Sequence, residues 1–233
     1  MSLRAALEQL RDYDGALLAN TLDCIDPTPA HELYMSGDIQ SVTPTLGPTV
    51  GLAVTCQLDS STPGGEPEND RYVEMLEIMD AMDEPSVWVV QTVGSRPDHD
   101  CTLGDGMAKM FHSLGCLGAV SAGRARDIAG LCATPFAVYC RGTAIHHCAL
   151  RYKAINVPIE VGGITVNPGD IIHASTEGVI KIPSAAVNGL LEKAPDMRAF
   201  EHEAHALLRR TDVSIRDKQR GVQDFLVKFG FTP

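Results

Sequence analysis

Apolar residues recur at helical spacing in several parts of the 233-residue chain. Leu3, Leu7, Leu10 and Leu17 predict an amino-terminal helix, with Ser2 as its candidate N-cap. Further helices are predicted over residues 72–82, 107–114, 127–132 and 184–210. Pro195 is expected to break or kink the last of these helices, because proline lacks the backbone N–H that a helix needs.

Short runs of apolar and β-branched residues predict strands between these helices. They cover residues 51–56, 87–90, 119–120, 136–140, 157–161, 164–166, 171–172 and 179–182. Gly162-Gly163 separates two of the runs and predicts a β-hairpin. No Gly/Ser-rich linker divides the chain, so we expect one α/β domain over residues 1–233, with helices at both ends.

Composition and charge narrow the possible functions. Hydrophobic residues make up 44% and charged residues 21%, which excludes a disordered chain. The chain has 19 basic and 30 acidic side chains, so a basic surface for nucleic acid or for an anionic membrane is not expected. No apolar run is long enough for a membrane span, and charges interrupt the amino-terminal residues. Together with seven scattered cysteines, this favours a reduced, cytoplasmic protein.

The segment from Gly104 to Asp127 carries the clearest candidate chemistry. Gly104, Asp105, Gly106 and Met107 open a predicted helix, where unpaired backbone N–H groups favour a carboxylate or a phosphate. The glycines leave room for a ligand to approach the backbone. The simpler alternative is that Asp105 only caps the helix and the glycines only form a turn.

Arg126 and Asp127 lie at the end of this segment. Arg126 could hold a carboxylate through two parallel hydrogen bonds, and Asp127 could bind a hard divalent cation. The alternative is an ordinary surface ion pair.

Two histidine groups are weaker candidates for a metal site. His146 and His147 are expected to lie in a strand and to point to opposite faces. His202 and His205, beside Glu201 and Glu203, are typical of a solvated helix face.

Residues 103–131, LGDGMAKMFHSLGCLGAVSAGRARDIAGL, resemble the RraA-like family, which includes 4-hydroxy-4-methyl-2-oxoglutarate aldolases and regulators of ribonuclease E activity. Asp105, Arg126 and Asp127 match the family's Asp-x20-Arg-Asp spacing. The likeness continues through residues 141–143, 156–158, 161–166, 168–170 and 178–183, and it spans roughly residues 15 to 210. The chain departs from the family pattern at Ala122-Gly123, at Gly106, over residues 175–178, and over Ser60 to Asp70, which is longer and more polar.

The resemblance implies a layered α/β domain of the swivelling β/β/α type and a role for each matching residue. The backbone of Gly104, Asp105, Gly106 and Met107 would bind the carboxylate of a pyruvyl group, and Arg126 its keto acid end. Asp127 would bind Mg²⁺ or Mn²⁺, while Asp105 would hold metal-bound water. Glu201, or Glu203 as the near alternative, would complete the site from a neighbouring subunit. Residues 184–233 would then be a helical extension that packs on that neighbour in a homotrimer or hexamer.

The implied activity is that of a divalent-metal-dependent lyase, a class II pyruvate aldolase. Its substrate would be a small anionic oxo acid containing a pyruvyl group. Retro-aldol cleavage of a substrate like 4-hydroxy-4-methyl-2-oxoglutarate and decarboxylation of oxaloacetate would pass through the same pyruvate enolate. The alternative is a non-catalytic regulator that binds a ribonuclease or another protein.

Overall fold

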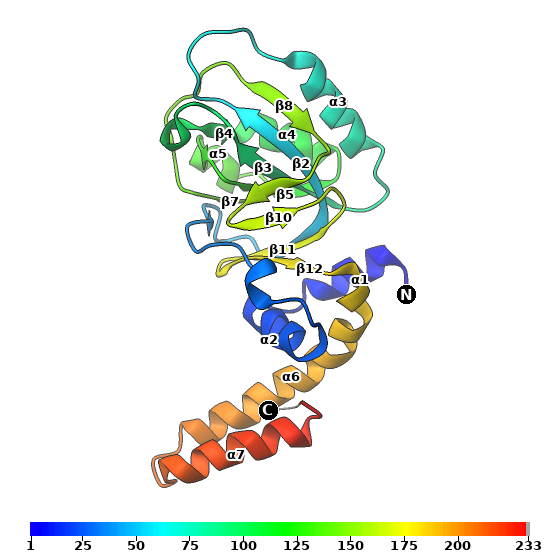
Figure 1. Cartoon of the computed structure of the whole chain (residues 1–233), viewed down its shortest axis with the longest axis vertical. Helices are drawn as coiled ribbons and strands as arrows, with labels where there is room; N and C mark the ends of the chain where they lie inside the picture. Colours follow the sequence, from blue (N-terminus) through cyan, green and yellow to red (C-terminus); the bar gives the residue numbers. More distant parts are fainter. Residues whose placement is uncertain (232–233) are drawn as a thin grey trace.

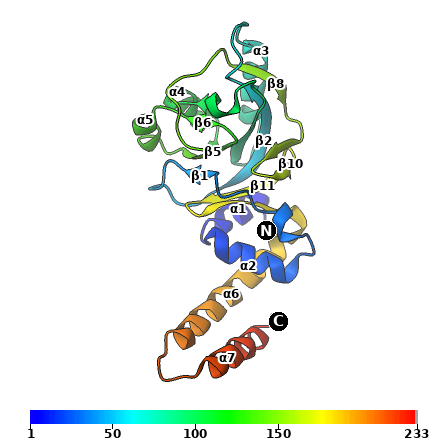
Figure 2. The same cartoon turned by 60° about the vertical axis from the view of Figure 1, so that its left-hand side comes forward.

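The computed structural model describes residues 1–231, and its centre is a strongly curved sheet of mixed strand direction (Figures 1 and 2). The strands of this sheet follow the order β1-β7-β5-β3-β2-β11-β12, and β8 pairs with the second half of β2. They are β1 (Gln40–Ser41), β2 (Thr49–Asp59), β3 (Ser86–Thr92), β5 (Cys116–Ser121), β7 (Ala137–Cys140), β8 (Arg151–Ile155), β11 (Ile171–Ser175) and β12 (Gly178–Ile182). Strands β2, β3, β5 and β7 are parallel, so their carboxyl ends meet at one edge.

Two layers cover the parallel part of the sheet. Three helices pack on one face: α3 (Asn69–Asp80), α4 (Asp105–Ser113) and α5 (Ile128–Cys132). The hairpin of β9 (Ile159–Val161) and β10 (Ile164–Val166) packs on the other. Trp88 faces the helices while Val87 and Val89 face the hairpin, because successive strand side chains point to opposite faces. The predicted β/β/α layering is confirmed.

A second group of helices packs on β11 and β12. It contains α1 (Leu3–Leu10), α2 (Gly15–Ile25) and α6 (Val187–Leu208), which share one apolar core with the two strands. The last helix, α7 (Ile215–Lys228), folds back along α6. Figures 1 and 2 show these two helices projecting away from the sheet, at the end of the molecule opposite α3. The predicted extension 184–233 is thus helical, although its last two residues lie outside the described part.

The structure corrects several predicted elements. The apolar spacing from Leu3 to Leu17 belongs to two helices, because Asp14 accepts a hydrogen bond from the Leu17 N–H at 2.8 Å and starts a new one. Strand β8 was not predicted, and α7 was expected only as part of the helical extension that the resemblance implies. Pro195 does not break α6, which continues to Leu208. Among residues 1–231, no helix has both the length and the apolar character that a bilayer crossing requires.

A buried histidine links the amino-terminal helices to the sheet. His173 in β11 is fully buried, its Nε2 lies 3.0 Å from the carbonyl oxygen of Tyr13, and its Nδ1 has no partner. Burial lowers the pKa of this imidazole below its usual value. The unfolded chain therefore binds a proton more readily than the folded one.

We therefore expect the contribution of His173 to the free energy of unfolding to be fully present above the ordinary histidine pKa of about 6.5. It should be lost as the pH falls below that value. Denaturant unfolding of the wild type and of His173→Gln, followed from pH 7.5 to 5, checks this. The free energy of unfolding should fall more steeply in the wild type. Parallel pH profiles would contradict the assignment.

Candidate functional site

The candidate site is a cavity of about 300 Å³ near the carboxyl ends of the parallel strands. This edge is the usual place for ligands in open α/β sheets. The small parallel pair β4 (Cys101–Leu103) and β6 (Arg124–Ala125) frames the cavity. Its lining residues are Thr102, Leu103, Gly104, Asp105, Gly106, Met107, Arg126, Asp127, His147 and Leu150. All the substrate and metal residues predicted within 104–127 therefore lie in one cavity.

Gly104 lets the start of α4 and the Arg-Asp pair approach each other. It is the N-cap residue of α4 and provides no side chain to bond the first backbone N–H groups. A Cβ atom added here would lie 2.4 Å from Asp127 Oδ2 and 3.3 Å from Arg126 Nε. The first turn of α4 therefore presents its N–H groups beside both charged side chains.

Arg126 follows β6 and is fixed by its backbone. Its N–H donates to the carbonyl oxygen of Leu103 at 3.0 Å, which aligns the start of α4 with Arg126. The side chain is 34% exposed, and Nε lies 3.3 Å from Asp127 Oδ2. The ion pair considered as the simpler alternative is therefore formed, but it forms within the cavity rather than on open surface.

Asp127 has a left-handed backbone, with φ 57° and ψ 41°. This conformation is costly for most residues but tolerated by Asp and Asn, and it is often found at functional sites. Asp127 precedes α5, yet its carboxylate makes no capping hydrogen bond and is 45% exposed. The backbone therefore holds a carboxylate in the cavity without using its oxygens for the fold.

Asp105 has a partner that the sequence reasoning missed. Lys109, one helical turn later, donates to Asp105 Oδ2 at 2.5 Å. This hydrogen bond holds the pKa of the Asp105 carboxyl below its usual value. The i,i+4 spacing of the two residues was the available signal. Asp105 also packs against α5 at Gly130, where a Cβ would lie 2.5 Å from Oδ2.

The acidic residues of α6 lie away from this cavity within one chain. Glu201 accepts a hydrogen bond from Asn20 Nδ2 at 3.0 Å, so it faces α2. Both carboxylate oxygens of Glu203 accept from Lys228 Nζ, at 2.6 and 2.7 Å. Glu203 is thus engaged by α7. A contribution of Glu201 to the cavity of another copy stays a prediction.

The expectation for the paired histidines is corrected. His146 and His147 lie in the loop between β7 and β8, not in a strand, and their rings are 5.3 Å apart. His147 lines the cavity, and His146 Nδ1 lies 3.5 Å from Arg126 Nη1. A loop can direct consecutive side chains to the same side, which strand geometry forbids. The strand geometry that made these two histidines weak candidates for a metal site therefore does not apply to them.

The family model described as Aldolase/RraA matches residues 19–181. The chain belongs to the RraA-like family. Over 148 residues it is 34% identical to the "Putative 4-hydroxy-4-methyl-2-oxoglutarate aldolase" of Halalkalibacterium halodurans, covering 60% of this chain and 68% of that protein. It is also 27% identical over 202 residues to protein DlpA of Legionella pneumophila, covering 84% of this chain but only 30% of DlpA.

A solved structure supports the same fold. Streptomyces coelicolor RraAS2, described as an unusual member of the RNase ES inhibitor RraA protein family, superposes with a TM-score of 0.68 at 24% identity. The match covers 86% of this chain and 96% of that one. The family model thus shows the RraA-like assignment, and the solved structure shows the same fold.

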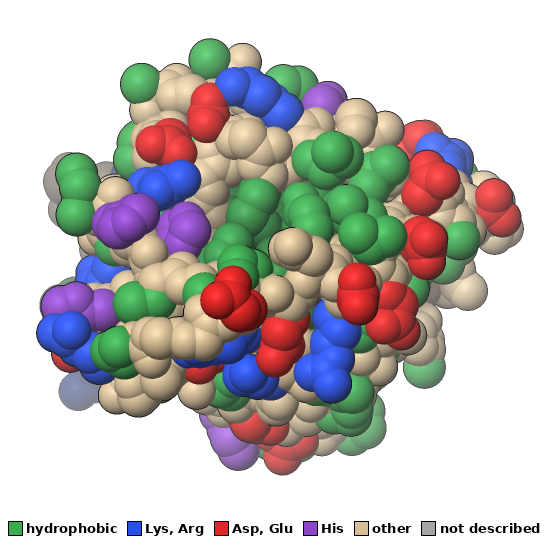
Figure 3. Space-filling view, turned by 90° about the horizontal axis from the view of Figure 1, so that it is seen from above, with side chains coloured by type: hydrophobic (Ala, Val, Ile, Leu, Met, Phe, Trp, Pro, Cys, Tyr) green, Lys and Arg blue, Asp and Glu red, His purple; other side chains and the backbone are tan. Residues whose placement is uncertain are grey.

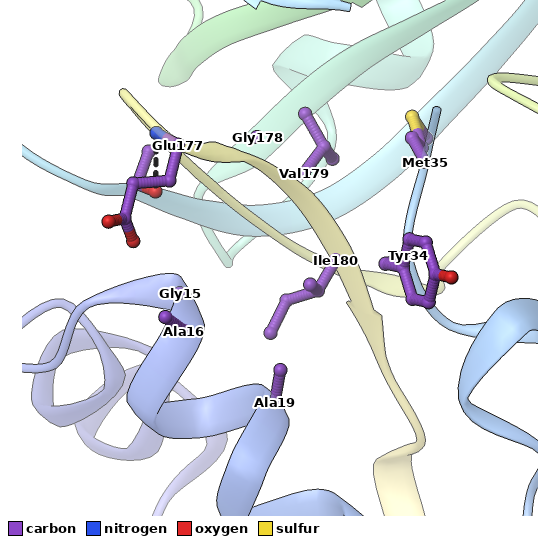
Figure 4. Close-up of a pocket in the computed structure, with 10 residues that line it drawn as sticks. Gly15, Ala16, Ala19, Tyr34, Met35, Glu177, Gly178, Val179 and Ile180 are labelled. Atoms are coloured by element: carbon purple, nitrogen blue, oxygen red, sulfur yellow. Dashed lines mark hydrogen bonds between the residues drawn. The ribbon is translucent and has the colours of Figure 1, made fainter. Parts of the chain in front are cut away.

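Another hollow of this RraA-like chain lies between α2 and β12, with a volume of about 220 Å³ (Figure 4). Small and apolar side chains such as Ala16, Ala19 and Ile180 dominate its lining. Glu177 lies at one end, and its N–H donates to Ser175 Oγ at 3.3 Å. This hollow lacks a group of converging polar side chains, so the cavity at Arg126 is the better candidate for chemistry.

Surface charge on one end of the molecule is mixed. Figure 3 shows a central apolar area bordered by acidic, basic and histidine side chains, seen from the end opposite α7. The view shows no continuous basic face of the kind that binds nucleic acid.

A substitution at Gly104 tests whether the close approach matters to the site rather than to the fold. In Gly104→Ala the new Cβ meets the carboxylate of Asp127 and the Cγ and Nε atoms of Arg126, and these side chains can move aside. We expect thermal stability to change little but ligand binding and turnover to fall at least about tenfold, as a lost contact of about 1.4 kcal/mol would produce. Gly37→Ala, where a Cβ meets nothing within 4 Å, is the matched control. Equal behaviour of the two variants would refute the argument.

Proposed function

We propose that this chain is a divalent-metal-dependent lyase that cleaves oxo acids containing a pyruvyl group. One observation carries the proposal: the open start of α4, the Arg126 guanidinium and the Asp127 carboxylate, which makes no capping hydrogen bond, share one cavity. The name of the Halalkalibacterium halodurans relative supports the same class of reaction.

The residues fit a hard divalent cation. Mg²⁺ commonly takes one or two protein carboxylates and fills its other positions with water and substrate oxygens. Among residues 1–231, no three His, Cys, Asp or Glu side chains gather to hold a metal by themselves. Asp127 would therefore be the direct ligand, and Asp105 would hold water nearby. When bound, Mg²⁺ or Mn²⁺ supplies a Lewis acid for the keto acid group.

The remaining steps use groups of the chain itself. The backbone N–H groups of Asp105, Gly106 and Met107 bind the substrate carboxylate at the positive end of α4. Arg126 binds the keto acid end and stabilises the negative charge that develops as the C3–C4 bond breaks. Breaking that bond leaves a pyruvate enolate, which is protonated to pyruvate. Loss of carbon dioxide from oxaloacetate would give the same enolate.

Turnover separates this function from that of a non-catalytic regulator. Pyruvate release is measured with 4-hydroxy-4-methyl-2-oxoglutarate and with oxaloacetate, each in the presence of Mg²⁺. The lyase proposal expects turnover of at least one acid, lost in Arg126→Ala. Absence of pyruvate with both acids, from a folded protein, would contradict the proposal and favour the regulator.

A further inference from the structure

The loop that carries the paired histidines is fixed on two sides of the cavity. On one side, Ala144 N–H donates to the carbonyl oxygen of Ala125 in β6 at 3.0 Å. On the other, Cys148 N–H donates to the carbonyl oxygen of Ser60 at 2.7 Å. Ser60 begins the polar segment that departs from the family pattern. The loop is therefore held between β6, which Arg126 directly follows, and the start of the segment that departs from the family pattern.

A buried ion pair secures that segment. Arg151 Nη2 lies 2.9 Å from Asp59 Oδ2 and donates to the carbonyl oxygen of Thr62 at 2.6 Å. Both charged side chains are about nine-tenths buried. Because a buried pair with these additional hydrogen bonds resists rearrangement, the loop has a rigid support at the point where His147 enters the cavity.

His147 presents one free ring nitrogen. Its Nδ1 lies 2.6 Å from the carbonyl oxygen of Cys148. A carbonyl oxygen only accepts, so in the neutral ring Nδ1 carries the hydrogen and Nε2 keeps its lone pair. Within residues 1–231, no side chain or backbone group forms a hydrogen bond with that Nε2. The half-buried ring lines the cavity together with Arg126 and Asp127.

His146 lies beside Arg126. Its Nδ1 lies 3.5 Å from Arg126 Nη1, at the long limit of a hydrogen bond. The two adjacent rings thus belong to one site: His146 lies beside the guanidinium, and His147 lines the same cavity as the start of α4.

We propose that His147 is the catalytic base for substrates with a hydroxyl group at C4; this rests on the proposed lyase function. Nε2 takes the proton of the C4 hydroxyl, and the O–H electron pair forms the new carbonyl bond. The C3–C4 bond breaks, and its electron pair forms the pyruvate enolate. His147 then releases its proton to solvent, and the enolate takes one proton from solvent at C3. The substrate class is therefore 4-hydroxy-2-oxo acids.

Decarboxylation provides the internal comparison. Oxaloacetate loses carbon dioxide without first losing a hydroxyl proton, so it needs Arg126 and the start of α4 but not His147. A defect at His147 should therefore distinguish the two reactions, whereas a defect in folding or in binding of the keto acid end should lower both.

His147→Asn is the sharpest variant, because its amide can keep the hydrogen bond to the Cys148 carbonyl while removing Nε2. We expect kcat/KM for 4-hydroxy-4-methyl-2-oxoglutarate to fall at least about a hundredfold, the usual contribution of a general base. Oxaloacetate decarboxylation should stay within about threefold of the wild-type value. His147→Gln should behave alike, since its amide cannot take up a proton. His31→Asn, at an exposed histidine, is the control.

Binding of oxalate, an analogue of the pyruvate enolate, is measured by calorimetry with Mg²⁺ and should persist in both variants. Unchanged aldol cleavage, or an equal loss of both reactions in variants that still bind oxalate, would overturn the role of His147. Failure of both variants to fold would also overturn it, since the ring would then serve the fold. A wild type that only decarboxylates would overturn His147 and keep the lyase. A wild type that turns over neither acid would overturn both.

Discussion

Arg126→Lys is expected to release pyruvate at least about tenfold more slowly than the wild type, and Arg126→Ala about a hundredfold or more. Lysine keeps the charge but loses the planar guanidinium, which can hold a carboxylate through two parallel hydrogen bonds. The Arg126 backbone is fixed by Leu103, so neither change should disturb the start of α4. Initial rates at saturating Mg²⁺, with thermal unfolding as a folding check, provide the measurement.

Asp127→Asn is the matched comparison for the adjacent residue. Asparagine tolerates the left-handed backbone that Asp127 adopts, so the variant removes charge without adding strain. We expect its defect to be a higher Mg²⁺ requirement, in contrast to the rate defect of Arg126→Lys. If both variants keep wild-type kinetics, the two side chains form only the ion pair seen in the cavity.

Mixing of two impaired variants is expected to restore part of the activity, which is the second large effect. Glu201 faces α2 in its own chain, and α6 and α7 project from the body of the molecule (Figure 1). If Glu201 completes the site of the next subunit in a trimer, each interface needs Arg126 from one chain and Glu201 from another. Arg126→Ala and Glu201→Ala should each be impaired alone. Together they should regain part of the wild-type rate.

The mixing experiment needs two controls: the oligomeric state of the protein and proof that the two variants assemble together. Mass measurement should find a trimer or a multiple of three, and it should confirm that mixed assemblies form. Glu203→Ala is a useful comparison, because Glu203 is already held by Lys228, and this variant should keep most of the wild-type rate without any mixing. Confirmed mixed assemblies without recovered activity would place Glu201 outside the site.

The local features of the cavity could be predicted from the sequence because they lie close together along the chain. The stripe of α4, the turn at Gly104 and the Arg126-Asp127 step belong to one continuous segment, and the fold brings its two ends together through β4 and β6. The layered fold followed from the alternation of strands and helices and from the family resemblance.

The features that could not be predicted from the sequence depend on contacts between segments that are far apart in the chain. Strand β8 pairs with β2, nearly a hundred residues away in the sequence. Its sequence, Arg151 to Ile155, contains charged residues that interrupt the apolar pattern by which a strand is predicted. The loop of His146 and His147 has no periodicity of its own, so its direction is set by Ala125 and Ser60. No local pattern shows that His147 lines the cavity or that His146 lies beside Arg126.

Removal of the divalent cation tests the central claim most directly. The wild-type protein is treated with a chelator, exchanged into metal-free buffer and assayed for pyruvate release from 4-hydroxy-4-methyl-2-oxoglutarate, before and after Mg²⁺ is added back. Because the cavity offers few protein ligands, the cation should leave readily. We expect turnover to be lost on chelation with the fold intact, and to return with Mg²⁺. Full activity after exhaustive chelation would contradict it.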